Sequence, residues 1–197
     1  DKTVLIRYPQ GNTKTSYTVP DSVTTIKSDA FESSNNLTSV TIGKGVTTIV
    51  YTIFDSCKNL TKVTVDGNNN YFSNDEYGVL FNKNKTTLVY YPQGNTRTSY
   101  TIPNTVTKIG NSAFYSCDNL TSVEITENVT TIDTYAFYSC WGLTSITIPE
   151  SVTTINSDAF NACVKLTSVT ILGGVTTIGP YAFNESLKTV YYSGTAK

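Results

Sequence analysis

Apolar side chains recur at fixed offsets along this chain, and one short block marks each recurrence. The block at 23–26 reads Val-Thr-Thr-Ile and returns almost unchanged at 46–49, 106–109, 129–132, 152–155 and 175–178. Four of the five steps between blocks are 23 residues long, and the exception runs from Val46 to Val106. A fixed short period predicts a stacked solenoid, in which each unit packs mainly against its neighbours. We therefore expect a broad, extended surface and no cleft.

Each block is followed by the same pattern of apolar and small residues. A Phe comes first, a Ser or Cys stands three residues later and, in all but the last copy, a Leu three further on, before Val or Ile at alternate positions. The unit reads V-x-x-I-x-x-x-A-F-x-x-C-x-x-L-x-x-V-x-I, and its Phe residues are Phe31, Phe54, Phe114, Phe137, Phe160 and Phe183.

This pattern predicts two kinds of local structure in every unit. The alternating V-x-I end is typical of a half-buried strand, whose side chains point to opposite faces in turn. The A-F-x-x-C-x-x-L stretch has apolar positions three apart, which favours a short helix or 3₁₀ turn. One unit cannot bury its Phe, Leu and Val alone, so stacked units share one continuous core. An ordinary β-sandwich is the weaker alternative, because it does not require Phe, Cys and Leu at fixed offsets.

A second, longer period accounts for the irregular step. Residues 8–13, Tyr-Pro-Gln-Gly-Asn-Thr, recur at 91–96, and Thr-Ser-Tyr-Thr at 15–18 recurs at 98–101. Residues 78–81 and 86–91 are rich in apolar and aromatic residues, and the polar stretch 82–85 between them predicts a hairpin turn. We interpret this region as a divergent β-unit spliced into the solenoid, because a linker would not be so rich in Tyr, Val and Leu.

We predict one elongated solenoid domain over residues 1–197. Residue 1 falls in the middle of a unit, so we expect the chain to be a fragment of a longer array. The parts of the domain are a partial divergent β-unit at 1–22, two repeats at 23–65, an inserted β-hairpin unit at 66–105, and four repeats at 106–190 with the last one shortened.

The joins between units carry a family resemblance. Ile-Pro-Asn-Thr-Val at 102–106 and Ile-Pro-Glu-Ser-Val at 148–152 resemble the join between units of the BspA-type leucine-rich repeat family, and Gly110 and Gly179 occupy that family's Gly position after the Ile of the block. Other copies have Lys27, Val50, Asp133 or Asn156 at that Gly position. The resemblance implies a β-rich α/β repeat solenoid, a right-handed superhelix with short strands and short helical or 3₁₀ turns in each 23-residue repeat.

The same resemblance implies a cell-surface protein whose signal and anchor lie outside this fragment, and it transfers no catalytic residue. The formal net charge is −1 and the basic residues are scattered, which argues against nucleic acid as a partner. No apolar run approaches membrane-spanning length, so we expect no membrane insertion by this fragment. The abundant Ser, Thr, Asn and Tyr suit an extracellular surface.

Few features of the sequence indicate catalysis or metal binding. The chain has no His, which removes Ser-His-Asp and Cys-His arrangements, and its acidic residues form no obvious pairs, so we predict no enzyme and no cofactor. The segment from Asp66 has Tyr71 and Tyr77 where a calcium loop needs Gly and Glu, so a polar turn is the better interpretation. The four Cys share one repeat position, which favours free buried thiols over disulfides or a metal site.

The candidate contact surface consists of strand positions that face away from the core. Their polar side chains alternate with the buried ones, although a β-branched polar residue also suits any exposed strand. The tyrosines around the insert are further candidates, because Tyr is a good interface residue. The candidates are Ser39, Thr41, Lys62, Thr64, Ser122, Glu124, Ser145, Thr147, Ser168, Thr170, Tyr71 and Tyr77.

Three functions fit this surface. The first is an extracellular adhesion or recognition module that binds a host or matrix protein, which the family resemblance favours. The second is a structural spacer in a longer surface array. The third is a glycan-binding module that uses the hydroxyl groups and tyrosines.

Overall fold

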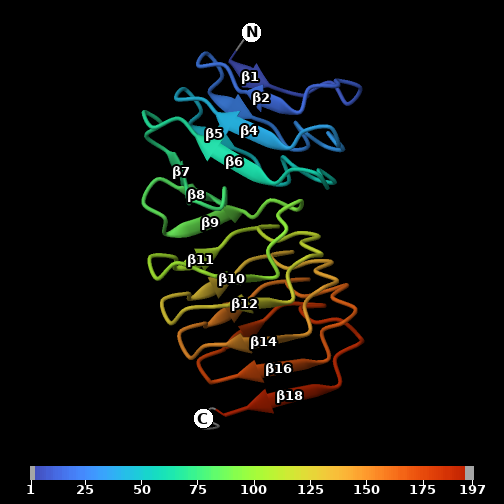
Figure 1. Cartoon of the computed structure of the whole chain (residues 1–197). Coiled ribbons are helices and arrows are strands. Elements are labelled where there is room, and N and C mark those ends of the chain that lie inside the picture. Colours follow the sequence, from blue (N-terminus) through green and yellow to red (C-terminus); the bar gives the residue numbers. More distant parts are fainter. Residues whose placement is uncertain (1–2, 194–197) are drawn as a thin grey trace.

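Two kinds of strand alternate along the chain, and each kind stacks into its own face of a solenoid. The computed structural model describes residues 3–193, which form about eight turns of chain between termini at opposite ends of the stack (Figure 1). Residues 1–2 and 194–197 of the predicted domain lie outside the described residues. The family fold that the repeats predict, a leucine-rich-repeat-like β-solenoid, is confirmed.

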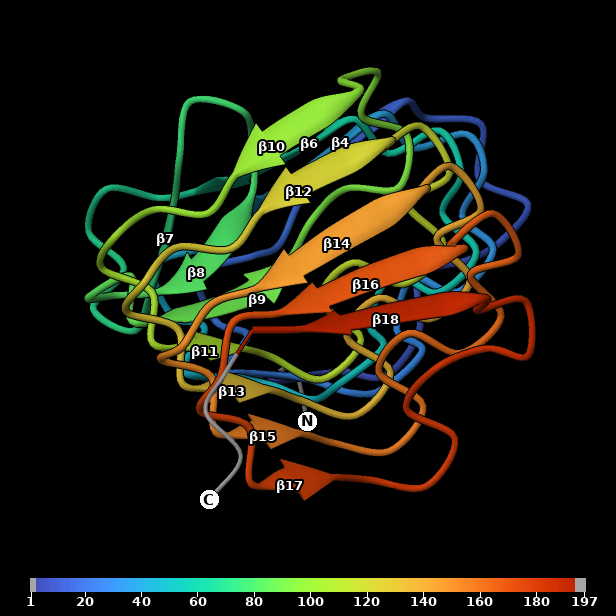
Figure 2. The same cartoon turned by 90° about the horizontal axis from the view of Figure 1, so that it is seen from below.

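The long-strand face comes from the V-x-I segments and forms three parallel sheets, β2-β4-β6, β10-β12 and β14-β16-β18. Apart from the insert, the short-strand face comes from the Thr-Ile ends of the blocks. It forms β1-β3-β5 and a sheet in the order β17-β15-β13-β11-β9-β8-β7. Figure 2 looks along the stack and shows the two faces on opposite sides of the core, with successive strands rotated. That rotation is the usual twist of neighbouring strands.

The bounds of the strands follow the repeat. The long-strand face has β2 (Ser16–Thr18), β4 (Ser39–Ile42), β6 (Lys62–Val65), β10 (Ser99–Thr101), β12 (Ser122–Glu124), β14 (Ser145–Ile148), β16 (Ser168–Ile171) and β18 (Thr189–Tyr192). The short-strand face has β1 (Val4–Leu5), β3 (Thr25–Ile26), β5 (Thr48–Ile49), β9 (Thr87–Tyr90), β11 (Lys108–Ile109), β13 (Thr131–Ile132), β15 (Thr154–Ile155) and β17 (Thr177–Ile178), and the insert adds β7 (Phe72–Asn74) and β8 (Leu80–Asn82).

Parallel pairing places the same repeat position of successive coils side by side. Ile146 pairs with Val169, and Ile132 pairs with Ile155. The register is strongly specified, because a slip of one residue would turn every buried side chain of a strand to solvent.

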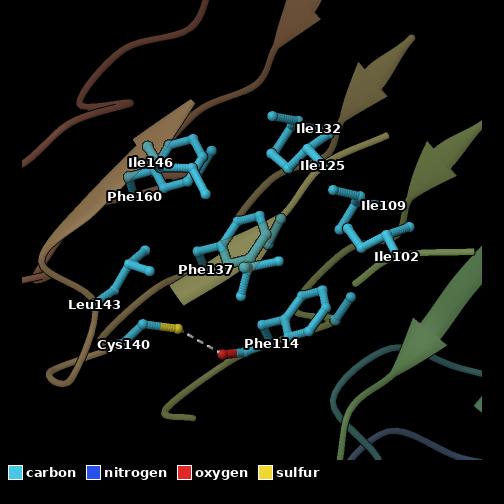
Figure 3. Close-up of a cluster of buried hydrophobic side chains, with 14 of the residues drawn as sticks. Ile102, Ile109, Phe114, Ile125, Ile132, Phe137, Cys140, Leu143, Ile146 and Phe160 are labelled. Atoms are coloured by element: carbon cyan, nitrogen blue, oxygen red, sulfur yellow. Dashed lines mark hydrogen bonds between the residues drawn. The ribbon is translucent and has the colours of Figure 1, made fainter. Parts of the chain in front are cut away.

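The Phe of each repeat forms a continuous stack inside the solenoid, as the sequence predicts. The rings of Phe114 and Phe137 lie 4.7 Å apart and nearly parallel, and those of Phe137 and Phe160 lie 4.9 Å apart (Figure 3). All three rings are fully buried. Burying one such side chain stabilises the fold by roughly 1.5–3 kcal/mol, so this column contributes a large share of the core energy.

The prediction of short helical or 3₁₀ turns is wrong, since no helix occurs within residues 3–193. In the first complete repeat the amide of Glu32 donates to Asp29 O within the coil at 3.0 Å. The amides on either side, of Phe31 and Ser33, donate instead to carbonyls of the next coil at 2.8 and 2.9 Å. A helix needs consecutive amides to bond within the segment. The three-residue spacing therefore comes from successive tight turns that share their hydrogen bonds with a neighbouring coil.

Left-handed backbone at two positions shapes five of the six turns. The residues two before and two after the Phe have φ between 54° and 62° there, for example Tyr135 (57°) and Ser139 (60°) on either side of Phe137, whereas the last turn has only Tyr181 in this conformation. The sequence did not indicate this, because most of these positions carry Ser, Asp, Thr, Ala or Tyr where Gly would have been the ordinary signal.

Threonine hydroxyls tie the coils together along a second line. The hydroxyl of Thr130 donates to Thr107 O at 3.1 Å, and that of Thr153 donates to Thr130 O at 3.3 Å. The same bond joins Thr47 to Thr24 and Thr176 to Thr153. The repeated first Thr of each block therefore has a structural role.

The insert splits the core into two clusters. Strand β8 pairs antiparallel with β7 and β9, and β9 pairs parallel with β11. Tyr90 packs on Phe54 of the N-terminal cluster, with ring centroids 4.9 Å apart, while Tyr91 stacks on Phe114 of the C-terminal cluster at 5.2 Å. Two consecutive tyrosines thus connect the two halves of the aromatic column.

Asn69 attaches the insert to the N-terminal half. This side chain is fully buried; its amide donates to Gly43 O and Val46 O, both at 2.9 Å. Its side-chain oxygen accepts from the amides of Tyr71 and Phe72, both at 2.8 Å. All four bonds are made only if an amide stands at this position.

We expect Asn69→Asp to destabilise the protein by roughly 2–4 kcal/mol, because a buried carboxylate would face two carbonyl oxygens. Urea unfolding followed by circular dichroism measures the shift in midpoint. Asn70→Asp is the matched control, since Asn70 is exposed and a change there should stay within about 0.5 kcal/mol. Equal midpoints for the two variants would contradict this role of Asn69.

Candidate functional site

The sequence-predicted strand residues lie on the outer surface of the long-strand face, which we call the hydroxyl face. Its register pairs Ser39 with Lys62, Thr41 with Thr64, Ser145 with Ser168 and Thr147 with Thr170. Their neighbours in each strand, such as Val40 and Ile146, are buried. The hydroxyl oxygens of Thr41 and Thr64 lie 2.8 Å apart in a hydrogen bond, so part of the hydroxyl surface is satisfied internally.

The insert divides this face into two groups of residues. The amide of Val63 in β6 donates to Gly78 O at 3.0 Å, and that of Val65 donates to Asn74 Oδ1 at 2.8 Å, so the insert covers the free edge of β6. Gly78 has φ +78°, and a Cβ there would lie 2.6 Å from Lys62 Cγ. The structure thus separates Ser39, Thr41, Lys62 and Thr64 from Ser122, Glu124, Ser145, Thr147, Ser168 and Thr170.

A shallow groove of about 470 Å³ brings four of the predicted residues together. It lies where β12 and β14 belong to different sheets, and it is lined by Ser122, Glu124, Ser145 and Thr147, with Ser99 and Thr101 of β10. The Thr101 hydroxyl donates to the Glu124 carboxylate at 2.8 Å. The groove therefore presents hydroxyl groups with one carboxylate, which suits polar contacts.

The two predicted tyrosines of the insert lie in different environments. Tyr71 is about half exposed. Tyr77 is partly buried, because the Arg97 guanidinium lies 3.7 Å from its ring centroid and Tyr100 packs against it edge to face. Tyr71 is therefore available for contact, whereas Tyr77 mainly packs within the insert.

Sequence reasoning missed four residues of this surface. Ser99 and Thr101 extend the hydroxyl face through β10, and the recurrence of 15–18 at 98–101 was the signal that could have placed them. Trp141 stands at the turn before β14 with 53% of its surface exposed, and Val164 occupies the same repeat position in the next coil with 55% exposed. The pair forms an apolar corner beside the hydroxyl face.

The expectation of no cleft is wrong. A cleft of about 630 Å³ opens on the short-strand side between β5 and β9, which are not paired. The insert adds β9, β8 and β7, in that order, to one end of the C-terminal sheet, while β5 remains at the edge of the N-terminal one. The repeat period alone did not reveal this gap between two separate sheets.

The cleft contains one ion pair and several tyrosines. Lys108 Nζ lies 2.7 Å from an Asp133 carboxylate oxygen. Burial opposes ionisation of Asp133, but hydrogen bonds from Lys108, the Thr134 amide and Asn156, with the Lys108 charge, hold its pKa below the usual value. Burial raises the pKa of Tyr115, and the charge of Asp55 across the cleft raises it further.

Comparison with known sequences settles the family. The sequence profile described as BspA type leucine rich repeat region matches residues 10–88 and 89–196 in six copies. The chain belongs to the BspA-type leucine-rich repeat family. Among curated proteins, none matches this repeat chain in sequence.

Three solved structures are similar to this BspA-type chain. A leucine-rich repeat protein from Eubacterium ventriosum shares 23% identity with a TM-score of 0.68, covering 93% of this chain and 77% of that one. The pneumococcal vaccine antigen PcpA shares 22% identity at 0.67, covering 92% and 57%. A leucine rich cell surface protein from Faecalibacterium prausnitzii shares 25% identity at 0.64, covering 91% and 60%. The chain thus spans less than two thirds of the last two proteins.

The cysteines of these repeats are free and buried, as their shared position predicts. The thiol of Cys140 donates to Phe114 O at 2.9 Å (Figure 3), and that of Cys163 donates to Phe137 O at 3.0 Å. Burial raises the pKa of Cys57 to about 11, and it also raises the pKa values of Cys117 and Cys140. Within residues 3–193 no group of three His, Cys, Asp or Glu residues is placed to hold a metal ion.

Over the same described range, no helix has the length and apolar character needed to cross a membrane. The BspA-type repeats therefore offer two surfaces of interest, the hydroxyl face with its apolar corner and the cleft.

We expect the thiols of the folded protein to resist alkylation. A pKa of about 11 against an ordinary 9.0 lowers the thiolate fraction of Cys57 roughly 100-fold at pH 8, and burial limits access further. Labelling with iodoacetamide, followed by mass spectrometry, measures the rate. The same chain in denaturant should label fully, and rapid labelling without denaturant would contradict the buried positions.

Proposed function

We propose that this chain is an extracellular, cell-surface recognition module that binds a host or matrix protein through the hydroxyl face. The observation that carries the proposal is the half-exposed ring of Trp141 at the rim of that face. Trp is enriched among the residues that dominate binding energy at protein interfaces, and a polar rim around such a residue is typical of them. The similar fold of a protein described as a leucine rich cell surface protein supports the location.

The hydroxyl face fits the binding of a protein partner better than it fits a spacer function. A spacer requires no exposed Trp, since its surface needs only to stay soluble. Here Trp141 and Val164 are exposed on adjacent coils, in the turns that precede β14 and β16, although the equivalent positions of other coils, Asn35, Lys58 and Asp118, are polar. An apolar corner beside a neutral, hydroxyl-rich surface presents both parts of an ordinary interface.

Glycan binding remains the second candidate function. The groove between β12 and β14 presents Ser and Thr hydroxyls, which can donate to sugar hydroxyls and accept from them. It also presents the Glu124 carboxylate, which can accept from sugar hydroxyls. Tyr71, with its exposed ring, offers an apolar surface elsewhere on the insert. No aromatic residue lines that groove except Tyr100, which is buried, so the protein-binding proposal has the stronger support.

Immobilised protein tested against purified extracellular matrix and serum proteins checks this function. We expect at least one saturable interaction, and Trp141→Ala should weaken it about tenfold or more, because truncation of a Trp that dominates an interface typically removes about 2 kcal/mol or more. A glycan array run in parallel tests the second candidate.

Tyr181→Asn is the matched control for Trp141→Ala. Tyr181 is an exposed aromatic residue of the last Phe-containing repeat with φ +55°, and Asn tolerates that backbone conformation. Its replacement should leave binding unchanged. If no protein of the panel binds, the spacer function is favoured. If both variants bind like the unaltered chain, the contact surface does not include Trp141 and the proposal for the hydroxyl face is wrong.

A further inference from the structure

The two walls of the cleft between β5 and β9 carry different chemistry. The N-terminal wall presents the carboxylates of Asp29 and Asp55, and the C-terminal wall presents the rings of Tyr115, Tyr135 and Tyr138. The repeat register explains this. Asp55 and Tyr115 both follow the Phe of their repeats, so they are successive members of one column that the insert has separated.

The carboxylates of the N-terminal wall have no cationic partner in the described part of the chain. Asp29 accepts from the Thr52 hydroxyl at 3.1 Å, and Asp55 accepts from the Ser56 hydroxyl at 3.3 Å. The lysine that lines the cleft, Lys108, is already paired with Asp133. Two of the three carboxylates in the cleft therefore keep an uncompensated negative charge, which attracts a cation.

The opposite wall offers an aromatic surface to the same cation. Tyr115 and Tyr138 stack with centroids 5.3 Å apart and an interplanar angle of 13°, and Tyr135 packs edge to face on Tyr138. Tyr115 is the member of this stack nearest the break, and it lines the same cleft as Asp55. The Asp55 charge is among the causes that raise the pKa of Tyr115.

A buried acceptor in the cleft lacks a donor. Gln93 lines the cleft and is 6% exposed; its side-chain amide donates to Tyr115 O at 3.0 Å. Its side-chain oxygen has no hydrogen-bond partner among the described residues. Buried polar atoms are nearly always paired, so this oxygen points to a ligand that supplies an N–H group.

The geometry points to an arginine-binding site: we propose that the cleft takes the guanidinium group of an arginine side chain from a peptide or protein. The planar guanidinium stacks on the face of Tyr115, and its N–H groups donate to Asp55 and to the Gln93 oxygen. Arginine has this combination of a flat cation, a fixed fork of donors and weak hydration, whereas lysine carries a compact point charge. A volume of about 630 Å³ lies within the usual range for ligand pockets.

This site goes beyond the hydroxyl face, because it lies on the short-strand side and uses other residues. A protein that binds the hydroxyl face need not enter the cleft. The arginine site can therefore be tested with a small peptide, and its outcome is independent of whether the matrix panel yields a partner.

The test uses isothermal titration calorimetry with acetyl-Gly-Arg-Gly-amide and the full chain. A peptide with citrulline in place of arginine is the matched neutral probe, and a lysine peptide tests the preference for a planar cation. We expect saturable binding of the arginine peptide that weakens as salt rises. The lysine peptide should bind several-fold more weakly, and the citrulline peptide at least about tenfold more weakly.

Two isosteric variants locate the contact. Asp55→Asn should weaken the arginine peptide about tenfold, and Glu32→Gln, at the same repeat position one coil earlier and outside the cleft, should leave it unchanged. Thermal melting shows whether each variant is folded, and Asp29→Asn with its control Asp158→Asn provides a second pair should Asp55→Asn fail to fold.

Three results would overturn the proposal. The first is the absence of saturable binding at millimolar arginine peptide. The second is equal affinity for the arginine peptide and either the citrulline or the lysine peptide. The third is unchanged affinity in a folded Asp55→Asn variant.

Discussion

Hydrogen bonding between adjacent coils is the constraint on which this structure depends. Alternate backbone amides of each turn segment donate to the next coil, and the strands of both faces pair with the strands of neighbouring coils. A single coil leaves these groups without partners and exposes its Phe, so no coil is stable alone. The spacing imposed by the strands, about 4.8 Å, also fits the separation of stacked aromatic rings. The Phe column and the backbone ladder therefore reinforce one another.

The same constraint explains the polar composition. A side chain placed once in every coil meets its own copies above and below, so hydroxyl and thiol groups can donate to the neighbouring coil. Thr130 and Cys140 both do so. The first Thr of each Val-Thr-Thr-Ile block has a structural role, although its hydroxyl is exposed. Among the hydroxyl groups, those that point outward from the V-x-I strands are therefore the ones left for recognition.

The insert is where the repetition ends and where individual features gather. It covers one edge of the hydroxyl face, divides the core, and leaves β5 and β9 without mutual pairing. In a perfect repeat, columns of equal residues would give a uniform surface. The break sets Asp55 opposite Tyr115, two residues whose column would otherwise be continuous. A cleft with chemically different walls is thus a consequence of interrupting a regular stack.

The sequence by itself determined the inward residues, because Phe137, Cys140 and Leu143 recur at offsets that only stacking can bury. It also determined the outward positions such as Ser145 and Thr147, since side chains alternate along a strand. It did not determine the turn type, because a three-residue spacing is compatible with a helix or with tight turns. Only the tertiary structure decided that amides would bond to neighbouring coils, and only the pairing partner of β9 decided where the cleft would open. Those choices depend on contacts between segments far apart in the chain, which no local pattern encodes.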